Sequence, residues 1–349
     1  MFKILKYMKK KDWMLFLASF VFIVFQVWLD LKLPDYMSEI TTLVETEGSS
    51  MSEVFAAGGW MLLCSLGSMI SSIAVMFFAS RMAANFGKEL RARQYDQVES
   101  FSMGEINRFS TASLITRSTN DITQLQMFVA MGLEVMVKAP ITGIWAITKI
   151  AGKGAEWSIA TAVAVVVLLV IIGIVIVFAV PKFRRIQGLT DNINRITREH
   201  LTGLKVVRAY NAESYQEKKF GKANDELTGN NLSAFRIMAI MMPGMQAIMN
   251  GLTLAIYWIG ALLINESVGA DKIAVFSNMV VFINYAMQVV MAFISLSMIL
   301  MMLPRVTVSA NRVLEVIETE SSIKDGPRTS SPEGMEGTVE FKNVSFKYP

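Results

Sequence analysis

The sequence predicts an all-α membrane protein with six transmembrane helices, long cytoplasmic helical extensions and a short C-terminal β-strand. Composition is the first observation: 53% of the 349 residues are hydrophobic and 18% are charged, whereas a soluble domain has about 25% charged residues. The second is a set of six apolar stretches, each at least as long as the roughly 20 residues that a helix needs to cross a bilayer. The third is that two long charged segments, 81–127 and 181–238, separate apolar stretches.

Charge and reactive residues exclude several classes of protein. The chain has one cysteine, Cys64, and one histidine, so neither an intramolecular disulfide nor a zinc or redox motif is predicted. We identify no catalytic residues and no metal ligands. The net charge is +4, and the basic residues are spread over several loops, which suits a cytoplasmic membrane face and does not suit a nucleic-acid partner.

The N-terminal segment 1–12 sets lysines among apolar side chains. This pattern is typical of an amphipathic helix that lies in the cytoplasmic headgroup layer. The alternative is a frayed polar terminus.

Six spans follow within a predicted transmembrane domain over 13–317. The spans are 13–33, 58–80, 128–149, 157–180, 239–264 and 273–303, the last of which is long enough to protrude from the bilayer. The expected loop 34–57 carries acidic residues and no Lys or Arg, whereas 1–12, 81–125 and 181–237 are rich in Lys and Arg. Because positive charge favours cytoplasmic loops, both termini are predicted to be cytoplasmic.

The two charged segments have helical periodicity interrupted near their middles. Each is predicted to form a helix, a short turn and a returning helix, so that neighbouring spans extend below the membrane by 1.5 Å per residue. Each pair then ends in an exposed tip, and the two tips form a docking surface. The alternative is two unrelated solvated loops, although unstructured loops of such length are uncommon.

The C-terminal part changes composition twice. Residues 318–336 collect Gly, Pro, Ser and charge and are predicted to be a linker. Residues 337–349 are predicted to be a β-strand, because apolar side chains recur along them: Val339, Phe341, Val344 and Phe346.

Three segments resemble a known family. The run RITREHLTGLKVVRAYNAESYQEKKF, from Arg195 to Phe220, resembles the second intracellular loop of ATP-binding-cassette (ABC) exporters. The run SLITRSTNDITQLQ, from Ser113 to Gln126, resembles their first loop, with Ser113 where glycine is commoner. Residues 337–349 resemble the first strand of their nucleotide-binding domain. The chain therefore resembles the transmembrane domain of an ABC exporter half-transporter of the multidrug or lipid type, cut just inside its ATPase domain.

This resemblance implies how the loops and the C-terminus would act. Tyr348 would stack on adenine, and ATP and Mg²⁺ would be bound by the nucleotide-binding domain, since the chain has no G-x-x-x-x-G-K-[ST] motif. The full-length protein would be an ATP-hydrolysing translocase. The tips would be coupling helices, with Tyr210 either an aromatic plug in the ATPase domain or packed between the loop helices. Their residues are Glu105, Ile106, Asn107, Arg108, Phe109, Arg208, Tyr210, Asn211 and Glu213.

The implied partners are a second half-transporter, nucleotide-binding domains and membrane lipids, with no nucleic acid. The assembly is a homodimer or a heterodimer, and Ser113 favours the heterodimer. The implied location is a bacterial plasma membrane.

Polar side chains at helical spacing mark two candidate faces for a substrate cavity. They are Gln246, Asn250 and Tyr257 in the fifth span, and Asn284, Gln288, Met291 and Ser295 in the sixth. Methionines crowd both spans and suit a site that accepts varied substrates. The alternative is packing between helices with polar residues as glue.

The third span contains two charges, Glu134 and Lys138. A charge within a span is costly and indicates function by default. We expect Lys138 to pair with Glu134 and reach toward the cytoplasm, with contact to substrate as the alternative. Asp30, near the outer end of the first span, is expected to be solvated.

Together these features predict a transmembrane subunit that exports hydrophobic or amphipathic molecules, such as a drug or a lipid, by alternating access. The alternatives are a membrane sensor or regulatory subunit with a degenerate ATPase domain, and a peptide exporter.

Overall fold

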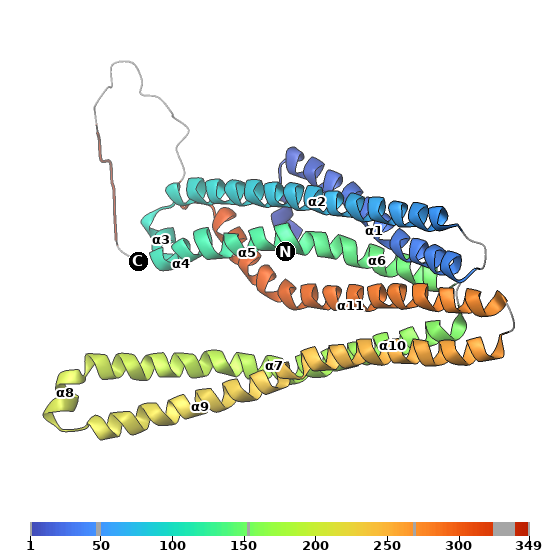
Figure 1. The fold of residues 1–349 in the computed structure, drawn as a ribbon. Coiled ribbons are helices and arrows are strands. Elements are labelled where there is room, and N and C mark those ends of the chain that lie inside the picture. The colour runs from blue at the N-terminus through green and yellow to red at the C-terminus, as the bar shows by residue number, and fades with distance from the viewer. Residues whose placement is uncertain (1, 47–49, 152–153, 268–269, 324–338, 348–349) are drawn as a thin grey trace, which may run out of the picture. The chain divides into compact units, whose positions relative to one another are not determined.

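The computed structural model describes residues 2–46, 50–151, 154–267, 270–323 and 339–347, and these are almost entirely helical (Figure 1). Short helical segments connect long ones. In chain order the elements are the 3-10 helix Phe2–Tyr7, α1 (Lys10–Glu45), α2 (Met51–Glu99), α3 (Met103–Phe109), α4 (Thr111–Thr116), the π-helix Arg117–Asp121, α5 (Ile122–Met127), the π-helix Phe128–Gly132, α6 (Leu133–Ile150), α7 (Ala155–Thr202), α8 (Leu204–Ala209), α9 (Glu213–Ala239), α10 (Met241–Glu266) and α11 (Ala270–Ile317).

Within these ranges, six helical stretches are long and apolar enough to cross a membrane. This confirms the predicted all-α class with six spanning helices. The stretches are Lys10–Glu45, Met51–Glu99, Thr111–Ile150, Ala155–Thr202, Glu213–Glu266 and Asp271–Ile317.

The expected loop 34–57 is largely helical, which corrects the prediction. Pro34 lies inside α1, which continues to Glu45, and α2 begins at Met51. Threonine hydroxyls beyond the proline bond to carbonyls four residues earlier, including Thr41 to Met37 at 2.8 Å, a pattern that a helix accommodates. The helix therefore continues through Pro34 into the segment that was expected to be a loop.

The described chain forms two compact units. The first contains Met1–Trp13, Arg81–Val129 and Pro304–Pro349. Its N-terminal segment packs on the end of α2: Lys9 pairs with Glu89 at 2.6 Å, and Asn85 donates to Asp12 at 3.1 Å. The apolar side chains of Ile4 and Met8 are buried here, so the segment is docked on protein. Contact of its lysines with headgroups stays a prediction.

Polar contacts also tie α11 to the π-helix Arg117–Asp121 within the first unit. Asp121 accepts a hydrogen bond from Ser309 at 2.9 Å and lies 3.3 Å from Arg312. Arg117 donates to the carbonyl of Arg312 at 2.8 Å and to Glu315 at 2.7 Å. The Thr-Asn-Asp part of the first-loop motif is thereby anchored on the end of the last long helix.

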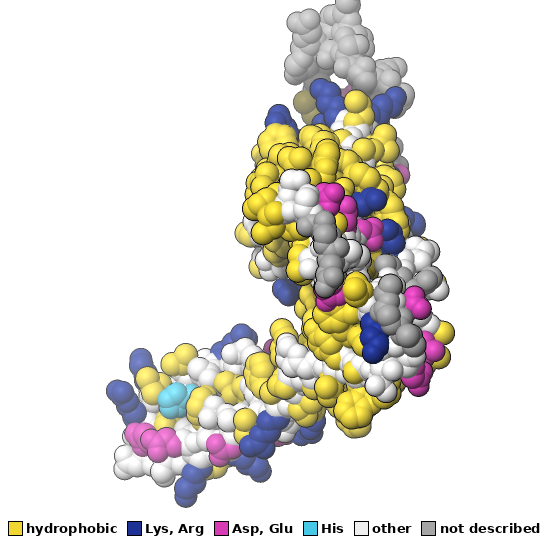
Figure 2. Space-filling view, turned by 45° about the vertical axis from the view of Figure 1, so that its right-hand side comes forward, with side chains coloured by type: hydrophobic (Ala, Val, Ile, Leu, Met, Phe, Trp, Pro, Cys, Tyr) yellow, Lys and Arg dark blue, Asp and Glu magenta, His cyan; other side chains and the backbone are white. Residues whose placement is uncertain are grey.

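The second unit contains Met14–Ser80 and Ala130–Leu303. Its core joins α1, α2, α6, α7, α10 and α11 around side chains such as Trp157, Phe282 and Tyr285. Helix α7 packs against both α9 and α10, and these run beside it in Figure 1. Charged side chains gather toward the α8 end of α7 and α9, and hydrophobic ones cover the region where α9 continues into α10 (Figure 2). This division is the one expected of helices that extend from the hydrocarbon core of a membrane into water.

The predicted C-terminal strand is not seen. Residues 339–347 form neither helix nor strand, and their apolar side chains are exposed. A strand requires a partner strand for its backbone groups, and within the described residues none is present. Part of the predicted linker and Tyr348 lie outside the described residues.

Candidate functional site

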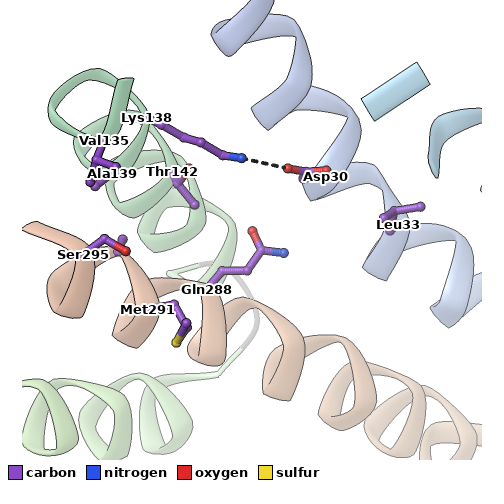
Figure 3. Close-up of a pocket in the computed structure, with 10 residues that line it drawn as sticks. Asp30, Leu33, Val135, Lys138, Ala139, Thr142, Gln288, Met291 and Ser295 are labelled. Carbon is purple, nitrogen blue, oxygen red and sulfur yellow. Dashed lines mark ion pairs between the residues drawn. The ribbon is translucent and has the colours of Figure 1, made fainter. Parts of the chain in front are cut away.

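A cavity of about 400 Å³ lies among α1, α6 and α11 in the second unit (Figure 3). This size falls within the range of about 300–1,000 Å³ that is typical of small-molecule sites. The lining combines polar and apolar groups. It consists of Asp30, Leu33, Val135, Lys138, Ala139, Thr142, Gln288, Met291, Ala292 and Ser295.

An ion pair crosses one side of this cavity. The Nζ atom of Lys138 lies 3.8 Å from Oδ2 of Asp30, and the two side chains are 33% and 32% exposed (Figure 3). Ser68 donates a hydrogen bond to the other oxygen of Asp30. The structure therefore corrects two predictions, because the ion pair of Lys138 is with Asp30, while its charge acts on Glu134 only at longer range, and Asp30 is engaged by protein. The lysine reaches across to α1, a neighbour that the sequence alone does not identify.

Thr142 adds a polar group without a partner. Its hydroxyl oxygen is buried, and the structure records no hydrogen bond to it, although buried polar atoms are normally bonded. Since Thr142 also lines the cavity, its hydroxyl is available to a molecule that enters.

A second polar cluster joins the same three helices outside the cavity lining. Lys149 of α6 pairs with Asp35 of α1 at 2.7 Å. Tyr285 of α11, which is 0% exposed, donates to Asp35 at 2.7 Å and to the carbonyl of Leu31 at 2.9 Å. Sequence reasoning missed this cluster. The sequence carried a partial signal, because the opposite charges of Asp35 and Lys149 lie at the outer ends of the predicted first and third spans.

The predicted cavity residues divide into two groups. Lys138, Gln288, Met291 and Ser295 meet in the cavity, as Figure 3 shows. The others lie outside its lining: Glu134 is half-buried on α6, and Gln246, Asn250, Tyr257 and Asn284 are exposed. On α10, Gln246 donates to Asn250 at 3.1 Å, so this helix presents a polar face that neighbouring elements of the described chain do not cover.

The first tip is α3 with its flanking turns. Ser102 caps the helix and forms a reciprocal capping box with Glu105, which satisfies amide groups that a helix start leaves free. Hydrogen bonds from Ser102 and Ser322 lower the pKa of Glu105 to about 2. Phe109 is buried and stacks on Phe101 with ring centroids 5.8 Å apart. Phe109 thus anchors the tip.

The other predicted residues of this tip are more accessible. Ile106 is half-buried, whereas Asn107 and Arg108 are exposed. Arg108 lies 3.8 Å from Glu315. The outward side of the first tip is therefore polar and basic.

The second tip is formed by α8 and the turn that leads into α9. Val207 is buried beneath it, while Tyr210 is 80% exposed. Asn211 has a φ of 50°, a left-handed conformation that asparagine tolerates better than most residues. The turn displays Tyr210 outward, so Tyr210 does not pack between the loop helices. Arg208, Asn211 and Glu213 are exposed beside it.

A hollow of about 420 Å³ lies behind the second tip, between the facing ends of α7 and α9. His200 and Gln216 line it, and Nδ1 of His200 and Oε1 of Gln216 are buried without a recorded partner. Arg208 and Glu213 also border this hollow, so two predicted tip residues face both the hollow and the surface.

Comparison with known proteins identifies the family. A family model described as the ABC transporter transmembrane region matches residues 15–304. The chain belongs to this family. As an ABC transporter transmembrane region with six spanning helices, it is an integral membrane protein. The resemblance found in the two loop motifs is confirmed.

Relatives of this ABC transporter region are found in several bacteria. An uncharacterized ABC transporter ATP-binding protein of Mycobacterium tuberculosis is 34% identical over 292 residues, covering 83% of this chain and 48% of the relative. One of Bacillus subtilis is 33% identical over 281 residues, covering 78% and 46%. An ATP-dependent lipid A-core flippase of Pseudomonas putida is 20% identical over 277 residues, covering 78% and 44%. The chain spans about half the length of these curated relatives.

Proposed function

We propose that this chain is the transmembrane part of an ATP-driven exporter subunit that moves hydrophobic or amphipathic molecules, such as drugs or lipids. The observation that carries this proposal is the cavity among α1, α6 and α11, which sets polar side chains in an apolar lining at the level of the spanning helices. Four of the candidate cavity residues that the sequence indicated, Lys138 as a charge in a span and Gln288, Met291 and Ser295 as one helix face, line this cavity.

The polar face of α10 is proposed to join this cavity when two half-transporters assemble. Gln246, Asn250 and Tyr257 are exposed in the single chain, and uncovered polar groups on a spanning helix are costly when they face lipid. Asn284 on α11 and Glu134 on α6 would border the same space. A second half-transporter, identical or not, would supply the missing cover, and Ser113 favours a non-identical one.

ATP and Mg²⁺ are proposed to act in a nucleotide-binding domain, in which Tyr348 would stack on adenine. The matched relatives are named ATP-binding proteins, and this chain covers about half of each. The exposed tips support transmission from such domains, because Arg108 and Tyr210 project from short helices at turns between long ones. Nucleotide binding would favour one arrangement of the helices, and the cavity would alternate between the two sides of the membrane.

The proposed location is a bacterial plasma membrane with both termini in the cytoplasm. The excess of Lys and Arg in 1–12, 81–125 and 181–237 supports this orientation. The relatives occur in bacteria. One of them is named a lipid flippase, which supports a lipid among the possible substrates.

ATP-dependent accumulation of a lipophilic dye and of a fluorescent lipid in inverted vesicles tests this function. The complete gene product is expressed alone and with any adjacent half-transporter. Uptake with one gene supports a homodimer, and uptake only with both supports a heterodimer. ATP hydrolysis that neither compound stimulates, with no uptake, would favour a peptide exporter. Absence of both hydrolysis and uptake would overturn the proposal in favour of a sensor.

A further inference from the structure

Helices α1 and α6 are joined by two ion pairs of the same residue types, and the two differ in geometry. Lys149 lies 2.7 Å from Asp35, a normal length for a charge-assisted hydrogen bond, and Tyr285 also donates to this carboxylate. Lys138 lies 3.8 Å from Asp30, too far for a hydrogen bond. In the first pair the carboxylate of Asp35 is bonded by protein groups, whereas the second pair borders a cavity of about 400 Å³.

The Asp30–Lys138 pair thus has hydrogen-bonding groups beside the cavity that protein partners do not fully use. The ammonium group of Lys138 has three donors. Its contact with Asp30 at 3.8 Å is not a hydrogen bond, and among the described residues the structure shows no hydrogen bond from this group. The buried hydroxyl of Thr142 lines the same cavity without a partner. A cation, an anion and a free hydroxyl therefore face one space.

We propose that the Asp30–Lys138 pair binds the headgroup of a zwitterionic amphiphile, with the ligand's anion on Lys138 and its cation on Asp30. This inference rests on the proposed export function and specifies its substrate class. A zwitterion leaves each protein charge with a new partner. A singly charged headgroup would leave either Asp30 or Lys138 unpaired in a poorly solvated place, which is the costly arrangement for a partly buried charge.

The rest of the cavity fits the apolar part of such a molecule. Leu33, Val135 and Ala292 contribute apolar lining. Met291 also lines the cavity and is 48% exposed, so the space is continuous with the apolar outer surface of α11. Alkyl chains can leave the site over that surface while the headgroup stays between α1 and α6.

The test uses the complete protein, with its partner subunit if one is required, in proteoliposomes. Three fluorescent lipids with identical acyl chains serve as probes: phosphatidylethanolamine (zwitterionic), phosphatidylglycerol (anionic) and O-ethylphosphatidylcholine (cationic). ATP-driven translocation is measured as protection from quenching. The zwitterionic lipid is expected to be moved about tenfold faster than either charged lipid, which corresponds to about 1.4 kcal/mol.

Variants reverse this preference in a defined order. Asp30→Asn removes the ion-pair partner of Lys138 and should favour the anionic lipid, whereas Lys138→Gln should favour the cationic one. The swap of Asp30→Lys with Lys138→Asp should restore the zwitterion. The matched control removes an ion pair outside the cavity, between α7 and α9, through Arg185→Gln with Glu226→Gln, and should leave the ratios of the three rates unchanged.

The outcomes separate this inference from the export function. If the wild type translocates the lipids but the two single variants keep its charge preference, the inference is overturned and the export function stands. If the wild type moves neither these lipids nor a lipophilic dye, the export function itself fails. A single-chain alkylphosphocholine added from the aqueous side distinguishes a soluble amphiphile from a bilayer lipid, and preference for either over its charged analogues supports the inference.

Discussion

Replacement of Tyr285 by phenylalanine is expected to destabilise the second unit by about 2 kcal/mol. The phenol is 0% exposed and donates to Asp35 at 2.7 Å and to the carbonyl of Leu31 at 2.9 Å. Interhelical hydrogen bonds in membranes average about 0.6 kcal/mol, and a bond to a charged group contributes about 1.5–3 kcal/mol. Asp35 keeps its pair with Lys149 at 2.7 Å, so the change leaves no isolated charge and the loss stays moderate.

The measurement is the apparent thermal midpoint of the protein in nanodiscs, followed by fluorescence-detected size exclusion. For a chain of this size, a loss of about 2 kcal/mol lowers the midpoint by about 3 °C. The matched control is Tyr257→Phe, which makes the same chemical change at a side chain that is 50% exposed and should shift the midpoint by less than about 1 °C. Equal shifts in the two variants would refute the stabilising role assigned to the Tyr285 bonds.

Three further changes test the tips and the first unit. Tyr210→Ala should leave stability nearly unchanged because the ring is 80% exposed, but should lower transport per ATP hydrolysed at least about tenfold if Tyr210 is an interface anchor. The pKa of Glu105 is lowered to about 2, so the Glu105 carboxylate stabilises α3 fully above pH 4.5, the ordinary pKa of glutamate, and this stabilisation is lost as the pH falls toward 2. Amide exchange in α3, corrected for intrinsic rates, should show the loss. Glu105→Gln should abolish the pH dependence. Gly87→Ala places a methyl 2.3 Å from the side chain of Gln126, which must move away from its 2.7 Å hydrogen bond with Arg91, so the thermal midpoint should fall. Gly188→Ala, with nothing within 4 Å, should not lower it.

The number of spanning helices could be predicted from the sequence because a hydrocarbon core imposes a simple rule of length and polarity. The ends of the helices could not be predicted as well. The first span was predicted to end at residue 33, yet α1 continues for a further twelve residues, from Pro34 to Glu45. Hydropathy measures what enters the membrane, and a helix does not need to stop where its apolar part stops.

Helical spacing likewise predicted which side chains share a face, but it could not predict which helices are neighbours. Gln288, Met291 and Ser295 share the cavity face of α11 as expected. Lys138 was matched to Glu134 because the two lie one turn apart, and the structure pairs it with Asp30 on another helix. Within one sequence the nearest opposite charge is known only along the chain, and the competing partner across space is not.

The two polar clusters on α1, α6 and α11 have complementary consequences for the cavity. Tyr285 precedes Gln288 by three residues, which is about 4.5 Å along a helix, so the bonds of Tyr285 to α1 fix the rotation of α11 close to the cavity. That fixed rotation determines that Gln288, and not a neighbouring aliphatic residue, faces Lys138. The Asp35–Lys149 pair and its bond to Tyr285 hold α1, α6 and α11 together. Asp30 and Lys138 can therefore exchange partners without separating the helices that carry them. If this reasoning holds, Tyr285→Phe should weaken the discrimination between lipid headgroups even at temperatures where the protein stays folded.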